Sequence, residues 1–257
     1  MKARELILDK VSFNYDELPV IQNLSIKVNP GEFLVLVGPS GCGKTTLLNL
    51  ISGYVKPVAG KIEANGIIRT VYQQDGLFPW LTASENIRMG LDTRSPNEIE
   101  NELKEIFELI NLKGFENSYP HELSGGMKQR VELARALAGD SDILLMDEPF
   151  SALDYQTRLR MRHELIRLLN KRPRTVVFVT HDIEEAAQLA DRIIVLSNRP
   201  ATIFNEFEVN SQKPRVLTDS SVIDAMKSVL NSLNLNTPDD ITVSSFDTLD
   251  NNLKIKS

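Results

Sequence analysis

The chain has 257 residues, of which 42% are hydrophobic and 25% charged, and this average composition excludes a disordered or collagen-like chain. A net charge of −6 argues against a basic nucleic-acid-binding surface, and the single cysteine, Cys42, cannot form an internal disulfide, which fits a reducing compartment. Because no apolar run approaches the roughly 18 residues of a membrane-spanning helix, we expect a soluble, cytoplasmic protein that a partner must hold at any membrane.

The N-terminal part of the chain is predicted to consist mainly of strands. Residues 6–13 and 21–28 alternate between apolar and polar side chains, which is the pattern of strands with one buried face. Residues 33–37 are continuously apolar, as expected of a strand that is buried on both faces. A glycine-rich loop and an apolar-periodic helix over 46–51 follow, and residues 67–72 are predicted to form another strand.

A helical block follows, because the apolar period becomes helical over residues 84–112. Ser95 and Pro96 match a helix N-cap followed by proline at the first helical position. One face of the helix after them carries five apolar residues, Ile99, Leu103, Ile106, Phe107 and Ile110. Since this block interrupts an α/β pattern, we expect an inserted helical subdomain over about residues 76–138.

The rest of the chain returns to strands of the buried type, at residues 143–146, 175–180 and 192–196, with helical segments between them. Alternating strands and helices predict a largely parallel sheet that helices cover. A C-terminal amphipathic helix is predicted from Val222, Met226, Val229, Leu230 and Leu233, and the chain beyond it is polar. We therefore divide the chain into a main unit, residues 1–210, and a C-terminal helix with a polar tail, residues 211–257.

A phosphate-binding loop is indicated by residues 38–45, which fit the pattern G-x-x-x-x-G-K-[ST] between a predicted strand and a predicted helix. Glycines let successive backbone N–H groups face an anion, and the helix adds its positive N-terminal end. In such loops the lysine, here Lys44, reaches the β- and γ-phosphates and the hydroxyl, here Thr45, ligates Mg²⁺. The expected nucleotide-binding residues are Gly38, Pro39, Ser40, Gly41, Cys42, Gly43, Lys44, Thr45 and Thr46.

Two acids, Asp147 and Glu148, end the apolar strand 143–146. In a phosphate-loop enzyme a strand-end Asp holds Mg²⁺, and an adjacent Glu can polarise the attacking water as a general base. We therefore assign Asp147 to the metal and Glu148 to catalysis.

A second anion site is predicted at residues 124–126, where the Ser124 hydroxyl and the N–H groups of Gly125 and Gly126 lie at the start of an apparent helix. One nucleotide needs only one phosphate loop. A second cradle therefore indicates that two copies of such a domain face each other and that each closes the nucleotide site of the other.

Residues 123–130, LSGGMKQR, resemble the signature motif of ATP-binding cassette (ABC) ATPases, and the other motifs of that family stand in the right order over residues 4–210. The resemblance implies the α/β fold of a P-loop NTPase ABC cassette. Such a cassette has a mixed core sheet, an N-terminal antiparallel β-subdomain and an inserted α-helical subdomain. The resemblance also implies an ATPase that uses ATP and Mg²⁺.

The resemblance implies roles for four further residues. Tyr15 is similar to the aromatic residue that stacks on adenine. Gln73 is similar to the glutamine that contacts Mg²⁺ and senses the membrane partner, although Gln74 beside it leaves a second register open. Asp154 lies in a segment similar to the D-loop, which crosses to the opposite subunit, and His181 is similar to the switch histidine at the γ-phosphate. The implied catalytic set is Lys44, Gln73, Glu148 and His181, and the implied metal ligands are Thr45, Gln73 and Asp147.

Three classes of ABC protein are considered for this sequence, namely transporter subunits, soluble ribosome-acting proteins, and DNA-repair or chromosome-structuring ATPases. DNA-repair and chromosome-structuring ATPases separate their nucleotide motifs by a very long coiled coil, and this sequence has none between Lys44 and Asp147. Soluble ABC proteins that act on ribosomes normally carry two cassettes in one chain, whereas this sequence has one phosphate loop. Residues 77–87 resemble the nitrate/sulfonate/taurine (bicarbonate) importer group. We expect the ATP-hydrolysing subunit of a bacterial importer for such a solute, or for a vitamin precursor, with the ribosomal class as the alternative.

The importer class implies several partners. A second cassette, identical or a paralogue, would complete the ATP sites, and integral membrane permease subunits would hold the chain at the cytoplasmic face of the inner membrane. An extracytoplasmic solute-binding protein would act indirectly, and no nucleic acid is expected. Phe78 and Trp80 either anchor the permease in a surface groove or pack inside the helical subdomain.

Overall fold

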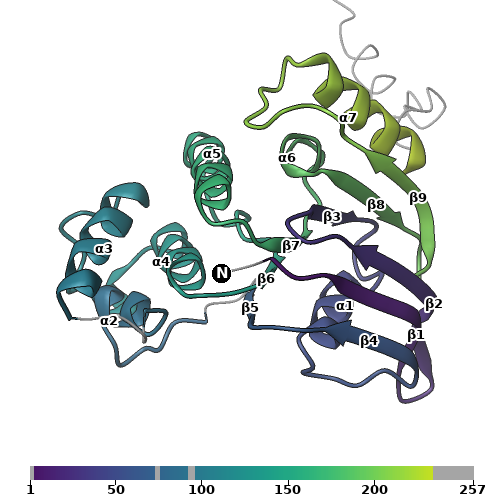
Figure 1. The fold of residues 1–257 in the computed structure, drawn as a ribbon, viewed down its shortest axis with the longest axis horizontal. Helices are drawn as coiled ribbons and strands as arrows, with labels where there is room; N and C mark the ends of the chain where they lie inside the picture. The colour runs from purple at the N-terminus through teal and green to yellow at the C-terminus, as the bar shows by residue number, and fades with distance from the viewer. Residues whose placement is uncertain (1–2, 73–75, 92–95, 234–257) are drawn as a thin grey trace, which may run out of the picture.

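The computed structural model describes residues 3–72, 76–91 and 96–233, which form an α/β structure built on two sheets (Figure 1). The larger sheet has the strand order β5-β6-β7-β3-β8-β9, and its strands are parallel except β9, which pairs antiparallel with β8. Its strands are β3 (Phe33–Val37), β5 (Ile68–Val71), β6 (Ile143–Asp147), β7 (Thr175–Val179), β8 (Arg192–Leu196) and β9 (Ile203–Glu208). The expected mixed core sheet is therefore confirmed.

The smaller sheet is antiparallel and has the order β2-β1-β4. Its strands are β1 (Leu6–Tyr15), β2 (Leu18–Val28) and β4 (Ala59–Ala64). The strands β4 and β9 are additions to the predicted set. Both are edge strands without a buried residue, so neither carries the apolar alternation by which a strand is found in a sequence.

The described part of the chain has seven α-helices and one 3₁₀-helix, and all but the last helix lie between strands in the chain. They are α1 (Lys44–Ile51), α2 (Ala83–Arg88), α3 (Pro96–Leu109), η1 (Pro120–Glu122), α4 (Gly125–Ala138), α5 (Tyr155–Lys171), α6 (Ile183–Leu189) and α7 (Ser220–Ser232). The predicted helical block over 84–112 is two helices, α2 and α3. Pro96 opens α3 as predicted, and the predicted N-cap Ser95 lies outside the described residues. None of the helices in the described ranges is long and apolar enough to cross a membrane.

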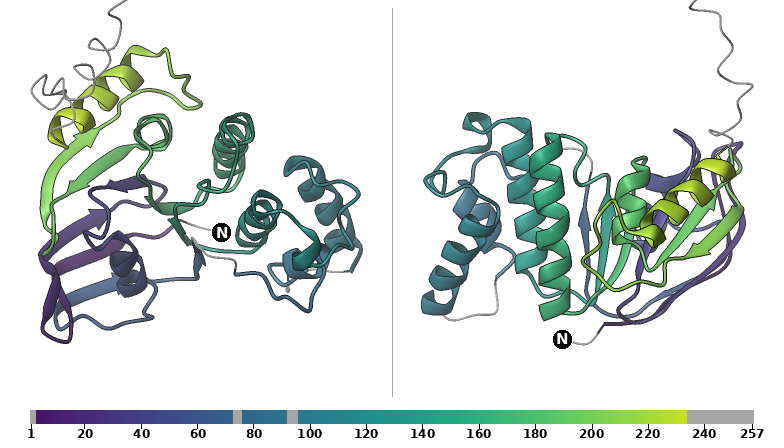
Figure 2. Two further views of the ribbon diagram at one scale, coloured as in Figure 1. Left: turned by 180° about the vertical axis from the view of Figure 1, so that it is seen from behind. Right: turned by 90° about the horizontal axis from the view of Figure 1, so that it is seen from above.

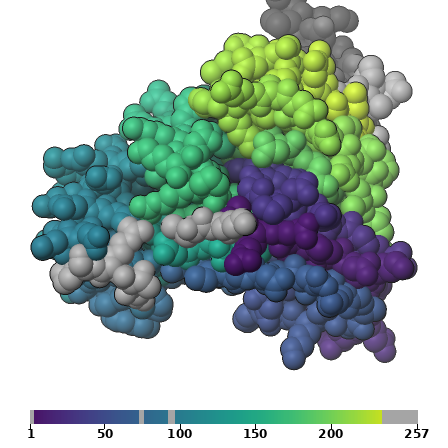
Figure 3. Space-filling view, in the orientation of Figure 1, coloured from purple at the N-terminus to yellow at the C-terminus, as the bar shows by residue number. Residues whose placement is uncertain are grey.

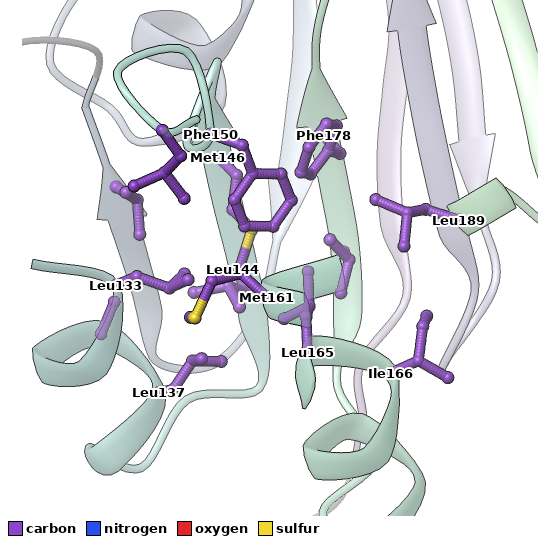
Figure 4. Close-up of a cluster of buried hydrophobic side chains, with 14 of the residues drawn as sticks. Leu133, Leu137, Leu144, Met146, Phe150, Met161, Leu165, Ile166, Phe178 and Leu189 are labelled. Atoms are coloured by element: carbon purple, nitrogen blue, oxygen red, sulfur yellow. The ribbon is translucent and has the colours of Figure 1, made fainter. Parts of the chain in front are cut away.

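The larger sheet is buried on both faces because helices or strands cover each of them. Alternate side chains of β3, for example Leu34 and Val35, belong to two different hydrophobic cores. One core lies between the two sheets and includes α1, and the other lies beneath α4, α5 and α6. Figure 4 shows the second core, where Leu133 and Leu137 of α4 and Met161 of α5 surround the strand β6. The continuous apolar runs in the sequence follow from this double coverage.

The helices are distributed unevenly over the molecule. The helices α4 and α5 stand side by side over one face of the sheet, and α2 and α3 lie beyond α4, farther from the sheet (Figures 1 and 2). The C-terminal helix α7 lies at the opposite end (Figure 3), where Val222 and Val229 join the core beneath α6. The C-terminal helix therefore packs on the main unit.

Candidate nucleotide-binding site

The glycine-rich loop begins where β3 ends and leads directly into α1. Gly43 caps this helix with a φ of 121°, a backbone conformation that residues other than glycine rarely adopt. A Cβ at Gly43 would also lie 2.9 Å from Cγ1 of Val20. Glycine is therefore required at this position both by the backbone conformation and by the close approach of β2.

Lys44 is the first residue of α1 and is almost fully buried. Its Nζ donates to the carbonyl oxygens of Gly38 (2.8 Å) and Pro39 (3.0 Å) and lies 4.0 Å from Sγ of Cys42. The ammonium group is thus held across the loop that precedes the helix. A lysine ammonium beside the N-terminal end of a helix is suited to a phosphate group.

Asp147 ends β6 and faces the start of α1. Asp147 is only 3% exposed, and burial raises the pKa of its carboxyl, with a smaller increase from the charge of Glu148. A hydrogen bond from Thr45 and the charge of Lys44 oppose that increase. A hydroxyl and a buried carboxylate that already contact each other are oxygen ligands of the kind that Mg²⁺ prefers, so the residues present fit this ion.

Glu148 follows in a left-handed backbone conformation, with a φ of 47°. Its N–H donates to the carbonyl of Val179 (2.9 Å), and its own carbonyl accepts from Nε2 of Gln129 (3.3 Å). His181 follows β7, and its Nδ1 lies 3.1 Å from Oε1 of Glu148. The structure thus brings together the carboxylate of Glu148 and the imidazole of His181, two of the four residues in the predicted catalytic set.

One pocket of about 590 Å³ gathers most of the predicted residues at the carboxyl ends of β3, β6 and β7. It is lined by Tyr15, Ser40, Gly41, Gly43, Lys44, Thr45, Thr46, Asp147, Glu148 and His181. Gly38, Pro39 and Cys42 belong to the same loop but do not line the pocket, and Cys42 is buried. Tyr15 is 47% exposed at the end of β1, where its ring makes an edge contact with Phe13.

Three further residues line the pocket and were missed by the sequence analysis, Val20, Val179 and Arg199. Arg199 lies in the segment between β8 and β9, which is tied to β2. The N–H of Ala201 donates to the carbonyl of Val20 (2.8 Å), and the N–H of Gln22 donates to the carbonyl of Ala201 (3.1 Å). Nη2 of Arg199 lies 3.9 Å from the position that a Cβ of Gly41 would occupy. A second cation therefore stands beside the phosphate loop, and no local motif marks it.

Four predicted site residues lie elsewhere on the same molecule. Ser124, Gly125, Gly126 and Asp154 do not line the pocket. Ser124 caps α4, with its Oγ accepting from the N–H of Met127 (3.3 Å), and Asp154 caps α5 through the N–H of Thr157 (3.0 Å). Ser124, Gly125 and Asp154 are exposed. Gln73, the remaining predicted ligand, lies outside the described residues, as does Gln74.

The pocket can bind a polyphosphate and support attack by water on it. Lys44 and the N-terminal end of α1 supply positive charge, Thr45 and Asp147 supply metal-binding oxygens, and Tyr15 supplies an aromatic surface at the rim. Glu148 and His181 line the same pocket, where the carboxylate can accept a proton and the imidazole can donate a hydrogen bond.

Comparison with known proteins agrees with this chemistry. Residues 21–151 match the family model described as "ABC transporter". The chain is 42% identical over 231 residues to an uncharacterised ABC transporter ATP-binding protein of Methanocaldococcus jannaschii, with 86% of each chain covered. It is 41% identical to the aliphatic sulfonates import ATP-binding protein SsuB of Bacillus cereus, over 82% of this chain and 87% of that protein. It is 38% identical to the taurine import ATP-binding protein TauB of Roseobacter denitrificans, over 76% and 77% of the two chains.

The fold is also similar to a solved structure, the ATP-binding cassette MJ0796 in a dimeric, post-hydrolysis state bound to ADP and Pi. The similarity has a TM-score of 0.73 at 32% identity and covers 80% of this chain and all of that one.

Proposed function

This chain belongs to the ABC transporter ATP-binding family, and on that premise we propose that it powers an importer of a small anion such as nitrate, a sulfonate or taurine. The pocket in which Lys44, Asp147, Glu148 and His181 meet at the strand ends is the observation that carries the ATP-hydrolysing role. Two of the relatives that share its sequence over most of their length are named for sulfonate and taurine import. A cassette does not contact the solute itself, so the solute class rests on those relatives and on the importer-like residues 77–87.

Hydrolysis would follow from the positions of the charged side chains. Lys44 and the loop N–H groups would hold the β- and γ-phosphates, and Tyr15 would stack on the base. The Glu148 carboxylate would orient a water molecule and accept its proton, while His181 would donate a hydrogen bond to the γ-phosphate. Mg²⁺, held by Thr45, Gln73 and Asp147, would neutralise charge that develops on the phosphates.

A second copy or a paralogue would complete each site. The N-terminal end of α4 carries the Ser124 hydroxyl and the N–H groups of Gly125 and Gly126, and Ser124 and Gly125 are exposed. These groups lie outside the nucleotide pocket of the same chain, so an anion bound to them would belong to another chain. We propose that two such chains pair head to tail, so that this end of α4 closes the nucleotide site of the partner. The dimeric state of the similar cassette structure supports this arrangement.

The permease would dock beside residues 77–87, on the side of the molecule that carries α2. Trp80 is 69% exposed, and its ring packs against that of Phe78 with 5.6 Å between centroids. The guanidinium of Arg135, on α4, lies over the Phe78 ring at 5.4 Å. Phe78 is half-buried and its ring supports that of Trp80. The exposed Trp80 could then anchor a membrane subunit at the cytoplasmic face.

The proposal is tested by purifying tagged protein from detergent-solubilised native membranes and identifying by mass spectrometry what accompanies it. We expect a permease in near-stoichiometric amount, and its loss in Trp80→Ala with unchanged ATP hydrolysis by the isolated subunit. Tyr54→Ala removes a similarly exposed aromatic ring in the segment that follows α1, outside residues 77–87, and serves as the control. Recovery of ribosomal proteins without a permease would overturn the importer proposal. Screening ligands against the associated solute-binding protein then shows whether the transported solute is an anion or a vitamin precursor.

A further inference from the structure

The switch histidine is held on both sides by a buried polar cluster. Oγ1 of Thr180 donates to Oε2 of Glu185 (2.7 Å) and accepts from the N–H of Asp182 (2.9 Å). Oδ1 of Asp182 accepts from the N–H of Glu185 (3.1 Å) and so caps α6. The two neighbours of His181 are therefore fixed by side chains that do not themselves line the nucleotide pocket.

Two arginines of α5 converge on the other oxygen of the same aspartate. Oδ2 of Asp182 accepts from Nη1 of Arg158 and from Nη2 of Arg162, both at 2.9 Å. Arg162 is 1% exposed and also contacts Glu185 (3.1 Å) and Gln188 (2.9 Å), so it belongs to the packed interior. Arg158 is 26% exposed and lies nearer the N-terminal end of α5.

Arg158 has a second contact, and this one lies in the segment 151–154 that precedes α5. Its Nη2 donates to the carbonyl of Leu153 (3.2 Å). On its other side this segment is tied to α4, because the N–H of Ala152 donates to Oε1 of Gln129 (3.0 Å). The guanidinium of Arg158 therefore donates hydrogen bonds both to segment 151–154 and to Asp182, the residue that follows His181.

We propose that Arg158 is a positioning residue that couples the placement of segment 151–154 to that of His181. The inference rests on the proposed function, in which a second cassette contacts this segment. Arrival of the partner would then set the position of Leu153, and through Arg158 and Asp182 the imidazole beside Glu148. A planar guanidinium suits this role because its two Nη atoms donate in fixed, diverging directions, whereas a lysine offers a single nitrogen.

The test compares Arg158→Met and Arg158→Lys with the wild-type chain, with Glu148→Gln as the inactive reference. Methionine keeps much of the apolar stem and removes the donors, and the partial exposure of Arg158 favours a folded variant. Arg160→Met is the matched control, because Arg160 is exposed on the same helix and lines the groove toward α3 instead. For each variant the measurements are kcat, KM, the affinity for ATP and the melting temperature.

We expect Arg158→Met to lower kcat by at least about tenfold while the affinity for ATP stays within about twofold and the melting temperature is kept. Arg158→Lys should recover part of kcat, and Arg160→Met should match the wild type. A residue with only a structural role would instead lower the melting temperature, the affinity and kcat together, which would overturn the inference.

A double-mutant cycle with Asp182→Asn tests the route through Asp182, since asparagine still caps α6. The double variant should lose no more kcat than the more damaged single variant, and independent multiplicative losses would overturn the route. Wild-type kcat in Arg158→Met would contradict this inference alone. A wild-type chain that fails to hydrolyse ATP would overturn the proposed function, and this inference with it.

Discussion

Glu148 holds an unusual conformation for a residue with a long side chain. A positive φ is disfavoured for any residue with a Cβ and persists only where the surroundings enforce it. Here the backbone on both sides is fixed, since the N–H is bonded to β7 and the carbonyl accepts from Gln129 and from Oγ of Ser151 (3.0 Å). In this conformation the Glu148 side chain reaches His181, whose Nδ1 lies 3.1 Å from Oε1 of Glu148.

Replacing Glu148 by Gln should separate binding from turnover. The amide has nearly the same shape but cannot accept the proton of the attacking water, so we expect kcat to fall by at least about 100-fold with the affinity for ATP retained. The variant should accumulate as a closed dimer with ATP, which size-exclusion chromatography with light scattering detects. Hydrolysis at the parent rate would show that Glu148 is not the base.

A role for Arg199 in ATP binding is predicted from its place in the structure, because no sequence motif includes it. Its guanidinium stands beside the phosphate loop and lines the pocket, so removing it should weaken the binding of a polyanion. Because the side chain is exposed, we expect Arg199→Ala to weaken ATP affinity by only about fivefold. Fluorescence titration measures this effect, which should shrink at high salt, and Arg88→Ala on α2 is the exposed control. Equal affinity of Arg199→Ala and wild type would exclude the contact.

At the scale of elements, the N-terminal end of α4 is where a second cassette would make contact. The Ser124 side chain caps this helix, and the adjoining Gly125 has no neighbouring atom within 4 Å of the place where a Cβ would lie. Gly126 instead packs on the segment 151–154, with the carbonyl oxygen of Ala152 at 3.2 Å from such a Cβ. The predicted anion site at residues 124–126 is therefore open at Gly125 and packed against segment 151–154 at Gly126.

Ser124→Arg should abolish turnover while the monomer still binds ATP. The bulky cation would stand where the nucleotide of the partner must fit, whereas the chain's own pocket lies elsewhere. Ser124→Ala is the comparison variant, since it removes the hydroxyl and the cap, at a cost of about 1 kcal/mol in folding free energy, without adding bulk, and it should lower turnover less than Ser124→Arg. ATPase rates and equilibrium ATP binding are measured on both. Normal hydrolysis by Ser124→Arg would rule out the two-subunit arrangement.

The elements also show what a sequence can and cannot reveal. The phosphate loop and the acids after β6 were predicted because each is continuous in sequence and follows a fully buried strand. Arg199 was missed because its place depends on pairing between residues 20–22 and Ala201, which are far apart in the chain. The edge strands β4 and β9 were missed because their exposed faces carry no apolar period.

At the scale of the whole molecule, the C-terminal segment is hydrogen-bonded to α6, the helix that follows His181. Arg215 lies between β9 and α7 and is only 2% exposed. Its guanidinium donates to carbonyls at the end of α6, including that of Ala190, and to those of Val209 (2.6 Å) and Ser211 (2.8 Å). Carbonyls at a helix end have no partner within the helix, so this side chain satisfies acceptors that would otherwise be buried without donors.

Arg215→Met should therefore lower the free energy of unfolding by about 2–4 kcal/mol, since it leaves several buried carbonyls without donors. Arg215→Lys should lie between, because one ammonium cannot reach acceptors on both α6 and the 209–211 segment. Urea denaturation followed by circular dichroism measures the differences, with the exposed Arg167→Met on α5 as a control that should match the wild type. Because α6 is capped by Asp182, loosening its far end should also reduce kcat at temperatures well below unfolding. A stable Arg215→Met variant with unchanged kcat would mean that the C-terminal segment does not support α6 or the position of His181.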